Sequence, residues 1–133
     1  MTMLDFILLY LLFRGKHFLC DYAFQNKWMV ENKIKPFPGG LKSLFAHAAI
    51  HGVGTTAVFL FFAPQLWWFG LVDMFVHAAI DKAKSVYSVK HDLKPHQHKF
   101  WVAFGLDQEF HNLTNMCFIM YAVYFLGFTG TWF

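Results

Sequence analysis

The stretch HFLCDYAFQ, His17 to Gln25, decides the fold of this chain, because it sets three polar side chains into an otherwise apolar run. His17, Asp21 and Gln25 follow one another at intervals of four residues. In an α-helix, residues four apart lie one turn apart on the same face. The stretch therefore predicts a helix with one polar stripe on an apolar surface.

The composition of the whole chain indicates a membrane protein. Its 133 residues make one domain, 57% are hydrophobic and only 14% are charged, far from an ordinary soluble protein. The ranges Gly52 to Val72 and Asn112 to Phe133 carry no charged residue. Each is close to the roughly 20 residues that a helix needs to cross the hydrocarbon layer.

Four hydrophobic segments follow one another along the chain, and all four are expected to be helices. They cover residues 2–24, 41–63, 66–84 and 100–129. Pro36, Pro38, Pro64 and Pro95 fall in the three connections and mark the ends of the helices. The predicted fold class is all-α: a single domain, residues 1–133, embedded in the membrane as a bundle of four transmembrane helices.

The distribution of lysine predicts the orientation of this bundle. Nine lysines lie at the first and third connections: Lys27, Lys33, Lys35, Lys42, Lys82, Lys84, Lys90, Lys94 and Lys99. The other side, with both termini, has no Lys or Arg. The positive-inside rule therefore places the basic loops in the cytoplasm and both termini outside. Attraction between these basic loops and the anionic headgroups of the lipid bilayer explains the net charge of +3, so no nucleic acid partner is expected.

Every predicted helix carries acidic or imidazole side chains four residues apart. The pairs are His17 with Asp21, His47 with His51, His77 with Asp81, and Asp107 with His111. Measured along the helices from the cytoplasmic ends, all eight residues fall in one layer about 5–15 Å deep. Ionisable groups at such a depth face the bundle interior, where they pair or serve a pathway. We expect the four pairs to converge.

A metal ion is the simplest partner for these groups. Imidazole and carboxylate together suit Zn²⁺, the preferred ion here, with Mn²⁺ or Fe²⁺ as alternatives. The predicted metal ligands are His17, Asp21, His47, His51, His77, Asp81, Asp107 and His111. Because eight residues exceed one tetrahedral shell, some are expected to orient other ligands or to bind a second ion.

Arg14 and Asp73 stand apart from the pairs. Their predicted depths match, which favours an ion pair between them over Asp73 as a further metal ligand. The alternative role of Arg14 is to hold a phosphate or carboxylate of a substrate. Lys16 points to a different face of the same helix. The candidate catalytic residues are therefore Asp81 and Asp107, as proton-accepting carboxylates, and Arg14.

These residues carry a resemblance to a known family. The strings HFLCDYAFQNKWMVENK, HAAIH, HAAIDKAK and DQEFH occur in this order along the chain. The pattern resembles a family of small integral membrane proteins of unknown function from bacteria and their phages. The resemblance touches all four helices and implies a multi-pass protein of the bacterial inner membrane, but it implies no activity. A looser similarity is to membrane-bound metal-dependent hydrolases.

The expected chemistry is hydrolysis of an anionic, phosphate-bearing or lipid-linked substrate. A metal with an open position activates water, and a nearby carboxylate can accept the proton. The basic loops favour an anionic lipid or a phosphate as the partner. The alternatives are a metal or proton carrier, a di-iron oxidase, and a phage or bacterial membrane adaptor with a structural polar or metal core. Enzymatic activity and the oligomeric state stay open.

Overall fold

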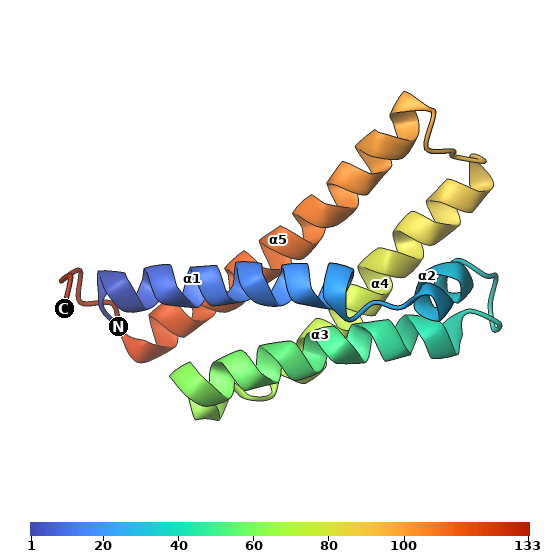
Figure 1. Cartoon of the computed structure of the whole chain (residues 1–133). Helices are drawn as coiled ribbons and strands as arrows, with labels where there is room; N and C mark the ends of the chain where they lie inside the picture. The colour runs from blue at the N-terminus through green and yellow to red at the C-terminus, as the bar shows by residue number, and fades with distance from the viewer.

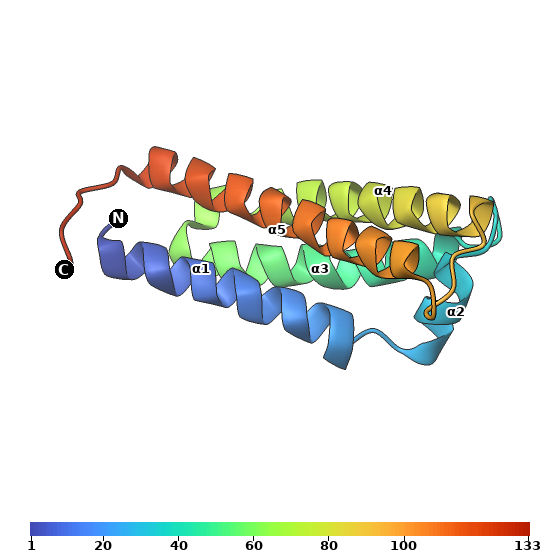
Figure 2. The ribbon, with the colours of Figure 1, turned by 90° about the horizontal axis from the view of Figure 1, so that it is seen from above.

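The computed structural model describes residues 1–133 and contains helices but no strand, which confirms the all-α prediction. The elements in chain order are α1 (Met3–Phe18), η1 (Leu19–Ala23), α2 (Lys27–Lys33), α3 (Leu41–Phe62), η2 (Pro64–Leu66), α4 (Phe69–Lys90) and α5 (His98–Leu126). Figures 1 and 2 show α1, α3, α4 and α5 running lengthwise beside one another. Both chain termini lie at one end of this bundle, and α2 lies toward the other.

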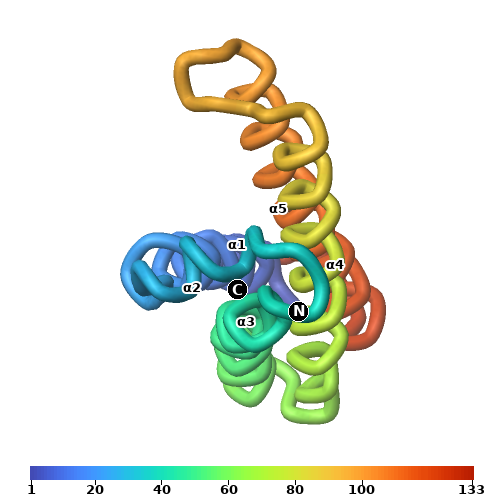
Figure 3. Tube along the Cα trace, turned by 90° about the vertical axis from the view of Figure 1, so that its right-hand side faces the viewer, coloured from blue at the N-terminus to red at the C-terminus, as the bar shows by residue number.

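The α4–α5 hairpin does not stay with the other two long helices over its whole length. Figures 1 and 3 show its loop end extending away from α1 and α3. α4 runs to Lys90, beyond the predicted limit of residue 84. The helix continues because no helix-breaking residue follows residue 84 until Asp92, whose φ of 47° lies in the left-handed region. α5 starts at His98 and ends before Gly127, which has a φ of 73°.

The N-terminal helix begins with a capping box and ends with a wider turn. The Thr2 hydroxyl accepts a hydrogen bond from the Asp5 backbone N–H at 3.2 Å, and the Asp5 carboxylate accepts one from the Thr2 N–H at 2.8 Å. The five residues of η1 then form a π-helical turn that carries Asp21. Such turns occur often at functional sites, since they change the direction of a side chain within a helix.

The first connection contains a short helix that the sequence pattern did not indicate. Asn26 caps α2 by accepting a hydrogen bond from the Met29 N–H at 2.9 Å. Residues 25–40 were expected only to connect two helices, as a loop without a helix of its own, and α2 corrects this expectation. The physical reason is that an Asn cap stabilises a helix of only seven residues, too short to show an apolar period.

The long helices enclose two regions of different chemistry. The first, here called the apolar core, consists of Leu9, Phe13, Phe59, Ala63, Leu66, Phe69, Phe118, Ile119 and Ala122. The second, here called the polar core, consists of the buried Lys16, His17, His47, His51, Thr55, Asp73, His77, Asp81, Asp107 and His111, with the half-buried Asp21. Each of α1, α3, α4 and α5 contributes to both regions. The same helices therefore change from apolar to polar packing along their length.

Close contact between α3 and α4 depends on Gly52. A Cβ atom at this position would lie 2.6 Å from the Gly70 carbonyl oxygen, which is shorter than any normal contact. Small residues allow such approach between helix backbones. The approach brings the polar stripes of α3 and α4 against each other.

By length and composition, α3 is the one helix that could span a membrane. The prediction of four such spans is therefore not supported by this criterion. α1 has only 16 residues, while α4 carries Asp73, Asp81, Lys82 and Lys84 along its length. On α4, the charged residues Asp73 and Asp81 of the polar core, together with Lys82 and Lys84, thus lower the mean hydropathy of the helix.

Candidate metal centre

Six side chains of the polar core form two groups that could hold a metal ion. Within each group the ligand atoms lie within 4.8 Å of one another. The first group consists of Asp21, His47, His51 and His77. The second group consists of His77, Asp81 and His111. Because His77 belongs to both groups, the two candidate sites adjoin.

The spacing within the first group suits coordination of one ion. Asp21 Oδ1 lies 3.0 Å from His51 Nε2 and 3.3 Å from His47 Nε2. The Nε2 atoms of His47 and His77 are 3.2 Å apart. Zinc bonds of about 2.0–2.1 Å would place neighbouring atoms of a tetrahedron about 3.3 Å apart. The observed separations fit ligands that share one ion, and they are also the distances of the hydrogen bonds that join His51 to Asp21 and His77 to His47.

The second group is centred on Asp81. Asp81 Oδ1 lies 3.3 Å from His111 Nε2 and 3.9 Å from His77 Nε2. The other oxygen, Oδ2, lies 3.6 Å from His47 Nε2 of the first group. Asp81 thus contacts both groups, and the arrangement could hold one ion in either group or two ions side by side.

Imidazole stacking aligns the ligands between the helices. The ring centroids of His51 and His77 are 3.6 Å apart, and those of His77 and His111 are 3.9 Å apart. Both pairs are stacked, with interplanar angles of 25° and 17°. The Nδ1 atoms of His17, His47 and His51 are buried without a protein partner, so packing and the Nε2 contacts orient these rings.

The two remaining predicted ligands, His17 and Asp107, lie beside the groups rather than in them. His17 Nε2 is 3.2 Å from Asp21 Oδ2 and 3.1 Å from Gln108 Oε1. Asp107 Oδ1 is 3.6 Å from His111 Nε2. The Gln108 amide donates to Asp21 and Asp107, each at 3.4 Å. Gln108 therefore links the two flanking residues, and all three are placed to orient the ligands.

A small polar pocket adjoins the carboxylates of the centre. Its volume is about 70 Å³, and its lining includes Asp21, Asp81, Asp107, Lys33 and Lys84. Lys33 Nζ donates to Asp81 Oδ2 at 2.8 Å, and Lys84 Nζ lies 3.6 Å from Asp107 Oδ2.

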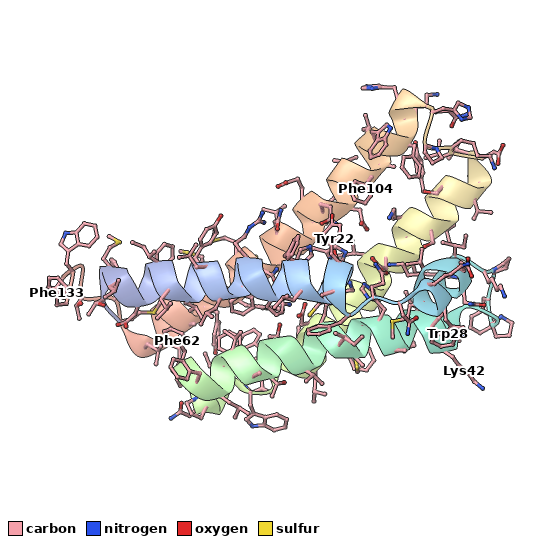
Figure 4. The ribbon with its side chains drawn as sticks, in the orientation of Figure 1. Tyr22, Trp28, Lys42, Phe62, Phe104 and Phe133 are labelled. Atoms are coloured by element: carbon pink, nitrogen blue, oxygen red, sulfur yellow. The ribbon has the colours of Figure 1, made fainter.

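The pocket is large enough for water, whose share of liquid volume is about 30 Å³. Figure 4 labels Tyr22, on the turn after α1, and Phe104, on α5, two aromatic residues of this lining.

The predicted ion pair between Arg14 and Asp73 is wrong. Asp73 Oδ2 instead accepts hydrogen bonds from Lys16 Nζ at 2.8 Å and from Thr55 Oγ1 at 2.5 Å. Lys16 Nζ also donates to Thr55 at 3.0 Å. The physical reason is the rotation of α1, which turns the Lys16 face inward and leaves Arg14 exposed.

Arg14 lies away from the candidate centre. Its guanidinium donates a hydrogen bond to Asn112 Oδ1 on α5. It lines a separate hollow of about 370 Å³ together with Glu109 and Asn112, and it is not among the residues around the polar pocket. The predicted role of Arg14 as a substrate-binding catalytic group is therefore not supported by its position.

Three residues of the site had a weaker signal in the sequence. Lys16 interrupts an apolar run, Lys33 closes the Glu-Asn-Lys string, and Gln108 follows Asp107 directly. Lys33 falls in the predicted connection between two helices, whereas Lys16 and Gln108 fall within predicted helices but outside the four His/Asp pairs. Only the folded arrangement reveals that Lys33, from the end of α2, reaches the carboxylate of Asp81 on α4.

The fold and the site define a class: small all-α proteins with a buried His/Asp centre between four long helices. Within this class the chain belongs to the family described as "Protein of unknown function (DUF3307)", whose model matches residues 7–131. This agrees with the resemblance to a family of unknown function. No curated protein and no solved structure matches the chain.

Proposed function

We propose that this protein is a multi-pass membrane protein that uses an intramembrane divalent metal centre to hydrolyse an anionic, phosphate-bearing substrate. The observation that carries the proposal is the convergence of Asp21, His47, His51, His77, Asp81 and His111 beside a polar pocket. Zn²⁺ is the preferred ion for this donor set, and Mn²⁺ and Fe²⁺ are the alternatives.

The distribution of side chains supports embedding of the whole bundle in a membrane, because large apolar side chains lie on its surface and ionisable ones in its interior. Leu11, Phe61, Phe75 and Tyr124 are 57%, 78%, 60% and 83% exposed, whereas His47 is completely buried. Water would disfavour so many exposed apolar side chains, whereas hydrocarbon accepts them. The helices α1, α4 and α5 have a lower mean hydropathy than a typical membrane span. They can still cross a bilayer, because their charged groups in the polar core face the interior of the bundle.

The proposed location is the bacterial inner membrane, with the basic loops in the cytoplasm. Lys90 ends α4, Lys94 lies in the loop that follows, and Lys99 lies in the first turn of α5, while both termini lie at the opposite end of the bundle (Figure 2). Anionic headgroups and the positive-inside rule both favour this orientation.

The chain offers groups for each step of a phosphate ester hydrolysis. A bound divalent ion would activate water and polarise the phosphoryl oxygen. Lys33 and Lys84 are placed to bind the anion in the polar pocket. Asp107 Oδ1 is buried, and its neighbour His111 Nε2 at 3.6 Å lies beyond hydrogen-bond distance, so we assign this oxygen to accept the proton of water. The water oxygen bonds to phosphorus, the ester bond breaks, and the leaving oxygen takes the proton.

A carrier function has less support from the packing. The apolar core closes the bundle between the polar core and the end with the termini, and it contains no polar side chain. A metal or proton carrier needs polar groups along its pathway. The non-enzymatic alternative is therefore an adaptor in which the metal or the polar network has a structural role.

Metal analysis of the detergent-purified protein tests the proposal. We expect one or two divalent ions per chain in the wild type and loss of metal in the His47→Ala, His51→Ala double variant. The matched control is His91→Ala with His96→Ala, two exposed histidines outside the core, which should retain the metal. A wild type without stoichiometric metal would overturn the proposal.

Turnover separates an enzyme from a structural metal protein. The metal-loaded wild type should hydrolyse para-nitrophenyl phosphate, and Asp107→Asn should reduce the rate by about 100-fold or more while the metal content stays unchanged. Full metal occupancy without hydrolysis of phosphate esters would instead support the adaptor.

A further inference from the structure

An apolar groove runs between α4 and α5 where the two helices form the extended hairpin. Its volume is about 720 Å³, which lies within the range of about 300–1,000 Å³ typical of ligand sites. Ala79 and Ala83 on α4 and Ala103 on α5 leave the space open. Leu106 and Phe110 line it as well and are each 55% exposed, so the groove can be reached from the surface of the bundle.

The groove adjoins the polar pocket of the candidate centre. Lys84 and Asp107 line both the apolar groove and the small polar pocket. On the far side of these two residues lies Asp81, which contacts both metal groups. An apolar chain in the groove would thus end at a polar pocket with metal-binding carboxylates.

Charge indicates what kind of headgroup fits at this junction. Lys33 and Lys84 line the polar pocket, and Lys99 lines the groove. With one divalent ion bound, the two pocket lysines and the ion together outweigh the three pocket carboxylates. The loaded pocket is then positive and attracts an anion, while the apolar walls of the groove attract hydrocarbon.

We infer that the substrate is a lipid phosphate, with its hydrocarbon chain in the α4–α5 groove and its phosphate between Lys33 and Lys84. This inference rests on the proposed function and names its substrate class. The bilayer delivers such a lipid laterally, so the substrate reaches the centre without crossing water. The phosphate displaces Lys33 and Lys84 from Asp81 and Asp107, which frees carboxylate oxygens beside the reacting group.

Lipid retention tests the inference by a measurement that does not require turnover. The metal-loaded protein is reconstituted into nanodiscs with phosphatidylcholine and a small fraction of phosphatidic acid, and the lipids retained after release into detergent are counted by native mass spectrometry. We expect the wild type to retain phosphatidic acid at least about tenfold over phosphatidylcholine, a preference worth about 1.4 kcal/mol. Equal retention of the two lipids would overturn the inference.

Two variants locate the bound lipid. Ala83→Phe with Ala103→Phe fills the groove and should remove the retained phosphatidic acid, whereas Ala57→Phe, an exposed alanine on α3, should not. Lys84→Gln should reduce the preference for phosphatidic acid over phosphatidylcholine. Unchanged retention in the filled-groove variant would place the lipid elsewhere and contradict the inference.

Inorganic phosphate distinguishes a lipid site from a site for free phosphate. Millimolar phosphate should displace phosphatidic acid only weakly, because it lacks the apolar chain. If inorganic phosphate displaced phosphatidic acid when the two were present at equal concentration, and if the filled-groove variant still bound phosphate normally, the site would be one for soluble phosphate. A protein that hydrolyses para-nitrophenyl phosphate but retains no lipid would keep the proposed function and refute the lipid substrate.

Discussion

The apolar core and the polar core are built by the same four long helices, yet they are held together in different ways. In the apolar core, Phe59 packs between Phe13 and Phe69 with ring centroids 5.5 Å and 5.3 Å away. Such contacts are weak one by one and tolerate small shifts. In the polar core, charged groups such as Lys16 and Asp73 are held by partners within hydrogen-bond distance, because an unpartnered buried charge is costly. The comparison indicates that polar contacts specify helix rotation and apolar contacts provide general cohesion.

Breaking the Lys16–Asp73 ion pair should have the largest effect. Lys16→Met leaves the Asp73 carboxylate buried without its cation, and we expect the free energy of unfolding to fall by about 3–5 kcal/mol. The Lys16→Met, Asp73→Leu double variant should recover most of this loss, since no charge then remains buried. Thermal unfolding in detergent measures the stability of the single and the double variant.

The exposed Arg14 provides the control for this ion pair. Because its guanidinium contacts Asn112 rather than Asp73, Arg14→Met should change stability by less than about 1 kcal/mol. If Arg14→Met were as harmful as Lys16→Met, and if Asp73→Leu rescued it, the observed pairing would be incorrect.

These two basic residues show where prediction from the sequence reaches its limit. Spacing of four residues was sufficient to expect that His17, Asp21, His47 and His51 face the interior, because helix geometry is local. Lys16 and Arg14 are two residues apart and lie on different faces of α1. Which face turns inward depends on the packing of α1 against α3 and α5, and this information is not local.

The same reasoning explains the other differences in the site. Lys33 reaches Asp81, in the middle of α4, from the C-terminal end of α2, which packs against α3. A helix of seven residues has no readable apolar period, so the sequence did not indicate this contact. The π-helical turn carries Asp21, whose carboxylate contacts His47 and His51 on α3, far away in the sequence. Long-range contacts, rather than local propensity, thus determine the details of the centre.

A cavity in the apolar core should have the next largest effect and should leave the metal centre intact. Phe59→Ala removes a fully buried ring, and we expect a loss of stability of about 2–4 kcal/mol, because the cavity lacks the contacts of the ring. Metal content and metal affinity should equal those of the wild type. Phe59→Leu, which keeps most of the volume, is the control and should cost less. Loss of metal from folded Phe59→Ala protein would show that the two cores are not separable.

The smallest expected effect concerns Gly54, which borders the polar core. A Cβ atom at Gly54 would lie 2.8 Å from Lys16 Cγ, so the side chain of Lys16 passes over this glycine on its way to Asp73. Gly54→Ala should therefore push the lysine stem aside and reduce stability by about 1 kcal/mol, although alanine is the better helix former.

Gly105 on α5 is the matched control for Gly54, since a Cβ atom there would have no neighbour within 4 Å. Gly105→Ala should stabilise the protein by up to about 1 kcal/mol through helix propensity alone. The two substitutions are chemically identical, and both lie in long helices. If thermal unfolding shows that one variant is destabilised and the other stabilised, the difference is due to the space that the side chain of Lys16 requires beside Gly54. If both variants were stabilised equally, Lys16 could not lie against Gly54, and the polar core would have a different helix rotation.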